Sequence, residues 1–82
     1  MKFKINYRLN FVLIGRAKFP LDILRAYLLS YHPDLCHRNF VKAIKTPSGT
    51  LFTYDWENIF FVARTTSILT HFVAHTKKLQ LA

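Results

Sequence analysis

The chain has 82 residues, with 12 Lys or Arg against 4 Asp or Glu, so its formal net charge at pH 7 is +8. This length fits one domain, residues 1–82, and an apolar fraction of 51% with only two glycines excludes a disordered or low-complexity chain. The excess of positive charge favours a polyanionic partner, because binding to one releases counterions.

The opening segment alternates between apolar and polar residues. Apolar side chains occupy the odd positions from Phe3 to Leu13, and polar side chains occupy the even positions from Lys2 to Asn10. Strict alternation is typical of a strand with one buried and one exposed face. We therefore predict one strand over residues 3–14, ended by Gly15.

A helix is predicted near residues 20–31. Proline suits the first helical position, and Asp22 complements the positive end of the helix dipole. The apolar residues that follow fall on one face: Leu21, Leu24, Leu28 and Tyr31. Pro33 disfavours helical geometry at the residue before it, so the helix should end near Tyr31, with a loop over residues 34–38.

Two further strands are predicted at residues 39–45 and 50–56, joined by the turn sequence Thr-Pro-Ser-Gly at 46–49. Residues 59–64 favour another strand, and residues 66–79 favour a closing helix. An alternative stays open, because Asp55 could cap one long helix over residues 56–79. The expected fold is α+β, with a small, single-layer, mostly antiparallel sheet packed by two helices.

No pattern in the sequence indicates catalysis. Cys36 is the single cysteine, so an internal disulfide is excluded, and Asp55 and Glu57 suit capping better than acid–base chemistry. His71 and His75 are spaced for one helix face, but no Glu stands between them and no Cys-x-x-Cys accompanies them. We predict a non-enzymatic protein without a metal or cofactor.

The basic residues indicate a binding surface for DNA or RNA. If the first strand lies beside the strand at 39–45, their cations form one positive stripe across the open face of the sheet. The predicted nucleic-acid-binding residues are Lys2, Lys4, Arg8, Arg16, Lys18, Lys42 and Lys45.

The alternative prediction is a protein-interaction module. A compact inhibitor or accessory factor, such as phages and plasmids encode, would bind an acidic or nucleic-acid-binding protein surface. Its anchors would be side chains of the types that dominate interfaces: Tyr31, Tyr54, Trp56 and Arg64. Self-association into a homodimer through the first strand is a further alternative.

The sequence predicts no membrane association. The longest apolar runs, 11–14 and 59–63, are far shorter than the roughly 18 residues that a membrane span needs. No apolar stretch typical of a signal peptide follows the N-terminus. A cytoplasmic location is expected.

Overall fold

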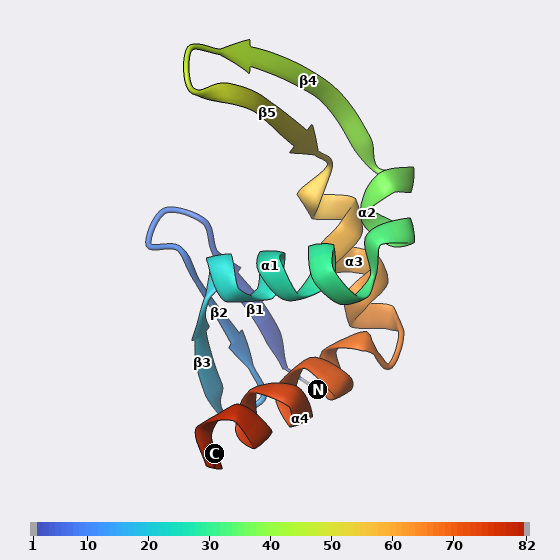
Figure 1. Ribbon diagram of the computed structural model, residues 1–82. Helices are drawn as coiled ribbons and strands as arrows, with labels where there is room; N and C mark the ends of the chain where they lie inside the picture. Colours follow the sequence, from blue (N-terminus) through green and yellow to red (C-terminus); the bar gives the residue numbers. More distant parts are fainter. Residues whose placement is uncertain (1, 82) are drawn as a thin grey trace.

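The computed structural model describes residues 2–81, and the side chains of residues 2–78. The elements in chain order are β1 (Phe3–Asn6), β2 (Phe11–Ile14), β3 (Ala17–Pro20), α1 (Leu21–Tyr31), α2 (Pro33–Arg38), β4 (Phe40–Thr46), β5 (Gly49–Tyr54), α3 (Trp56–Thr65) and α4 (Ile68–Leu81). The strands form an antiparallel sheet β1-β2-β3 and a separate antiparallel hairpin β4-β5 (Figure 1). The predicted α+β class is confirmed, whereas the prediction of a single sheet is wrong.

The single strand predicted over residues 3–14 is also wrong, because the chain reverses at residues 7–10. Asn6 Oδ1 accepts a hydrogen bond from the Leu9 backbone N–H at 2.8 Å, and Asn10 adopts a positive φ of 58°. Asparagine is one of the few residues that tolerates that conformation and closes turns with its own side chain. β1 and β2 therefore pair with each other, and β3 follows after a second turn.

The reversal changes which positions face inward. In β1 the odd residues Phe3 and Ile5 pack on the core, whereas in β2 the even residues Val12 and Ile14 do so. Phe11 therefore lies on the outer face, although the alternating pattern assigns it to the same face as Phe3.

The hairpin predicted around residues 46–49 is confirmed. Thr46 pairs with Gly49, whose φ of 136° is open to glycine but strained for other residues. The second strand ends at Tyr54, two residues before the predicted end. The hairpin extends away from the rest of the molecule, and every residue of β4 is exposed (Figure 1).

The strand expected at 59–64 is a helix. Asp55 accepts a hydrogen bond from the Asn58 backbone N–H at 3.2 Å and so caps α3. Ile59, Phe60 and Ala63 are buried, a spacing that suits one helix face. The single helix over 56–79 does not form either, because the backbone of Thr66 is extended and separates α3 from α4.

The first helix ends at Tyr31, as predicted from Pro33. Leu21, Leu24 and Leu28 are buried as expected, but Tyr31 is 57% exposed. Residues 34–38, expected as a loop, belong to α2, in which Pro33 takes the first helical position.

The hydrophobic core lies between the three-stranded sheet and the helices. Phe72 of α4 is fully buried, and its ring contacts Phe19 of β3 and Tyr27 of α1, each with a centroid separation of 5.1 Å. α1, α3 and α4 thus lie on the inner side of this sheet and leave its outer face open (Figure 1).

Candidate nucleic-acid interface

The outer face of the three-stranded sheet carries two rows of side chains. Strand register places Lys4 of β1, Leu13 of β2 and Lys18 of β3 in one row. Asn6, Phe11 and Pro20 form the next row. The two lysines are exposed and the two β2 residues are half-buried. An apolar strip on β2 is therefore flanked by a cation on each neighbouring strand.

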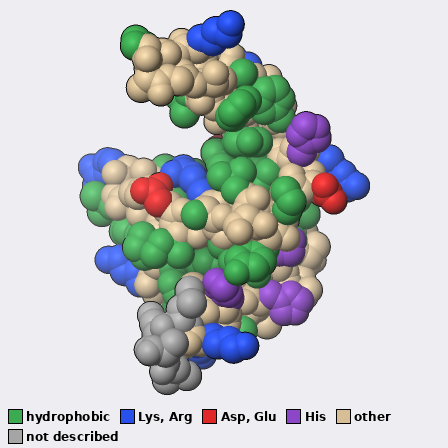
Figure 2. Space-filling model, viewed as in Figure 1, with side chains coloured by type: hydrophobic (Ala, Val, Ile, Leu, Met, Phe, Trp, Pro, Cys, Tyr) green, Lys and Arg blue, Asp and Glu red, His purple; other side chains and the backbone are tan. Residues whose placement is uncertain are grey.

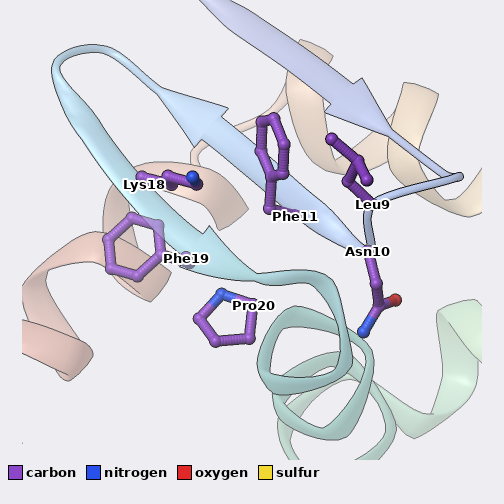
Figure 3. Close-up of a pocket in the computed structure, with 6 residues that line it drawn as sticks. All are labelled: Leu9, Asn10, Phe11, Lys18, Phe19 and Pro20. Atoms are coloured by element: carbon purple, nitrogen blue, oxygen red, sulfur yellow. The ribbon is translucent and has the colours of Figure 1, made fainter.

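Lys18 and Phe11 are in direct contact. The Lys18 Nζ lies 4.4 Å from the centroid of the Phe11 ring, within the range of a cation–π interaction. Beside them is a shallow, mainly apolar pocket of about 430 Å³, lined by Leu9, Asn10, Phe11, Lys18, Phe19 and Pro20 (Figure 3). An aromatic surface and a positive charge thus share one site.

Three more predicted cations lie at the two ends of this sheet. Lys2 and Arg16 lie at one end of the sheet, where the Gly15 backbone N–H donates to the Lys2 carbonyl at 2.8 Å. Arg8 lies in the β1–β2 turn at the opposite end, and all three side chains are exposed. We call Lys2, Lys4, Arg8, Arg16, Lys18 and Phe11 together the basic sheet face.

Among residues 2–78, no acidic side chain forms an ion pair with the cations of the basic sheet face. The single ion pair within that described range joins Arg25 Nη1 to Asp22 Oδ1 at 3.3 Å, and neither residue belongs to this face. Its five cations are therefore available to an external anion.

Lys42 and Lys45 lie elsewhere, so the continuous stripe predicted from residues 2–45 does not form. Both are on β4, which among residues 2–81 pairs with β5 alone, in a sheet separate from β1. They are three positions apart on one strand, so they point to opposite faces of the hairpin. Figure 2 shows Lys and Arg side chains at the hairpin tip, along the body and near its lower end rather than in one field.

Phe11 and Leu13 are the outer-face residues that sequence reasoning missed. The alternating pattern assigned them to the buried face of a single strand. The two asparagines at positions 6 and 10 were the available signal, because asparagine is enriched in turns.

The predicted protein-interaction anchors contact different neighbours. Tyr54 and Trp56 adjoin each other at 5.6 Å, and the Trp56 ring stacks on Phe60 at 5.5 Å. Tyr31 packs beside His75 at 5.0 Å, on the α1–α4 side of the molecule. Arg64 lines a cavity with four residues on another side: Phe3, Thr66, Leu69 and Thr70.

Cys36 and His75 are engaged in packing. Cys36 is buried, and burial raises the pKa of its thiol, which lowers the fraction of reactive thiolate. The His75 ring lies 5.3 Å from that of Tyr27, whose pKa is raised by burial and then by Tyr31. Within residues 2–78, no three His, Cys, Asp or Glu side chains group as a metal site would require.

Tyr7 in the β1–β2 turn is half exposed, and its ring approaches that of Phe60 at 6.5 Å. Partial burial raises the pKa of Tyr7, nearby Glu57 raises it further, and Arg25 opposes the shift. Tyr7 is therefore uncharged at physiological pH.

Comparison of the chain with protein-family models, curated proteins and solved structures finds no match. In the part of the chain from residue 2 to residue 81, no helix has both the length and the apolar character for a membrane span.

Proposed function

We propose that this protein is a small, non-enzymatic nucleic-acid-binding module that uses the basic sheet face. The observation that carries the proposal is the row Lys4–Leu13–Lys18, with Phe11 beside it and in contact with Lys18. Cations on the two outer strands can meet phosphates while the apolar middle strand meets bases.

The dimensions of this arrangement suit a nucleic-acid strand. Lys4 and Lys18 are two strands apart, which is roughly 10 Å at the usual spacing between neighbouring strands. That separation corresponds to about three nucleotides of a helical strand at 3.4 Å each. A base placed against Phe11 would gain roughly 1–3 kcal/mol from stacking, in addition to the phosphate contacts.

The first experiment is a fluorescence anisotropy titration with single-stranded DNA, single-stranded RNA and duplex DNA between about 50 and 200 mM salt. The test variant is Lys4→Gln/Lys18→Gln. Its control is Lys77→Gln/Lys78→Gln, which removes the same charge from exposed positions on α4. Both variants carry a formal net charge of +6, that is, +8 less two lysines.

The Lys4→Gln/Lys18→Gln variant should lose two phosphate contacts. Each phosphate contact contributes about −0.9 to the slope of log K against log salt concentration on duplex DNA. The slope should therefore become shallower by about 1.8, and the affinity near 0.1 M salt should fall roughly 60-fold. The α4 variant should change much less. If the two variants lose equal affinity, the loss depends on net charge alone, and the assignment of binding to the basic sheet face is refuted.

The variant Phe11→Ala distinguishes a nucleic-acid target from an acidic protein target. It should weaken binding to single strands about 5- to 150-fold, corresponding to the loss of 1–3 kcal/mol of stacking, without changing the salt slope. The exposed aromatic Phe61 on α3 provides the control variant Phe61→Ala. If the wild-type protein binds no oligonucleotide at low salt, the remaining target is an acidic protein surface, as for an inhibitor or accessory factor.

A further inference from the structure

The β4–β5 hairpin is an unsupported element with a large apolar surface. Five large apolar side chains on it are between 38% and 58% exposed: Phe40, Val41, Ile44, Leu51 and Phe52. A two-stranded hairpin without a third strand or a covering helix is marginally stable in water. Exposure of this kind in a folded protein marks an interaction surface.

The two strands of the hairpin differ in charge. β4 carries Lys42 and Lys45, whereas β5, from Gly49 to Tyr54, carries no charged residue. Lysine on an edge strand hinders pairing with another chain, and an uncharged edge permits it. β5 is rich in threonine and aromatic residues, which favour strands. The edge of β5 is therefore the one open to an additional strand.

The space beside β5 is accessible. Figure 1 shows β5 on the side of the hairpin that faces the body and β4 on the outer side. Figure 2 shows that the hairpin overhangs an open hollow between its tip and the body. A strand from another molecule could enter this hollow and reach the β5 edge.

We propose that two copies of the chain associate by antiparallel pairing of their β5 edges, which forms a four-stranded sheet. A second copy fits this edge because β5 supplies an uncharged strand to an uncharged strand. Although each copy carries a net charge of +8, no like charges would lie directly opposite each other. A two-fold axis perpendicular to the sheet places one β5 residue opposite its own counterpart. Leu51 and Phe52, each 56% exposed, then lie at the centre and contact the second copy.

Sedimentation equilibrium of the full chain at several concentrations tests this proposal. The test variant is Leu51→Lys, which places a cation next to its counterpart at the seam. Its control is Ile44→Lys, because Ile44 pairs with Leu51 on the same rung of the hairpin but lies one strand away from the seam. Far-UV circular dichroism establishes that both variants are folded.

The wild-type protein should form a dimer, and Leu51→Lys should raise its dissociation constant by about tenfold or more, while Ile44→Lys should raise it much less. Outward-facing β5 amides should gain protection from hydrogen exchange as the concentration rises, a measurement that needs no variant. A monomer at every concentration, or equal effects of the two variants, would overturn the proposal.

Salt distinguishes this association from nucleic-acid binding. Two copies of the same positive chain repel each other, so added salt should strengthen the dimer. Salt should weaken nucleic-acid binding. If the salt-strengthened dimer is absent but salt-sensitive nucleic-acid binding is present, the dimer proposal has failed. If the dimer is present but the nucleic-acid binding is absent, the proposed function has failed.

Discussion

Replacement of Phe60 by Ala should destabilise the protein strongly, whereas replacement of its neighbour Phe61 should not. Phe60 is 2% exposed and Phe61 is 62% exposed, so the pair compares a buried and an exposed side chain of the same type on one helix. Phe60 also stacks on Trp56 with a centroid separation of 5.5 Å. The comparison tests directly whether residues 56–65 form a helix.

The expected magnitude follows from burial. Removal of a buried Phe costs about 3–5 kcal/mol, while an exposed substitution costs about 0.5 kcal/mol or less. The whole domain should have roughly 4–12 kcal/mol of stability at 0.05–0.15 kcal/mol per residue. Phe60→Ala therefore removes a large share, and the melting temperature should fall by at least about 12 °C at 4 °C per kcal/mol.

Urea denaturation followed by circular dichroism measures both variants, with Phe61→Ala as the matched control. The free energy of unfolding should fall for Phe60→Ala at an unchanged slope against urea concentration. If the two variants lose equal stability, or if Phe61→Ala loses more, the inner face assigned to α3 is wrong. A strand would bury alternate residues instead, so 59, 61 and 63 would share one face.

Two further predictions concern a helix cap and the buried thiol. Asp55→Ala removes the acceptor for the Asn58 backbone N–H and should cost about 1 kcal/mol of unfolding free energy in urea. Asp34→Ala, at an exposed position in the first turn of α2, should cost about 0.5 kcal/mol or less, and an equal loss would contradict the cap. Cys36 should react with iodoacetamide much more slowly in the native protein than in urea, because burial blocks access and raises the pKa of the thiol. The native rate should rise with pH as thiolate forms. Mass spectrometry follows the alkylation, and equal native and unfolded rates would exclude a buried thiol.

Elements defined by local chemistry could be predicted from the sequence. Leu21, Leu24 and Leu28 specify a helix face by their spacing, and Pro33 fixes the end of α1. The Pro-Ser-Gly turn likewise specifies the β4–β5 hairpin. In each case the residues that determine the structure are close to one another in the sequence.

Elements defined by competition between patterns were harder to predict. The run Ile59-Phe60-Phe61-Val62-Ala63 is apolar at every position, so periodicity cannot separate a strand from a helix. The Asp55 cap decides for the helix. In residues 3–14, the alternating pattern predicts one continuous strand and hides the turn signals of Asn6 and Asn10. In the structure, the turn at these residues determines the fold.

The candidate site was also predictable where local structure places its residues, and unpredictable where a long-range strand pairing was needed. Five of the seven predicted nucleic-acid-binding cations, Lys2, Lys4, Arg8, Arg16 and Lys18, come from one continuous segment, so local hairpins bring them to one sheet. Lys42 and Lys45 could join them only through a long-range strand pairing. No local pattern specifies such a pairing, and β4 pairs with its own neighbour β5 instead.

The distribution of lysine over the strand edges connects the two proposals. The described sheets have four edges, and β1, β3 and β4 carry Lys4, Lys18, and Lys42 with Lys45, respectively. Lysine on an edge strand hinders pairing with other chains. On β1 and β3 the same lysines flank the uncharged strand β2, and it is this arrangement on which the proposed nucleic-acid binding rests. Protection of these edges and binding of nucleic acid are therefore compatible uses of one charge pattern. β5 lacks this protection and its apolar side chains are exposed as well, which is why the proposed association is assigned to this edge.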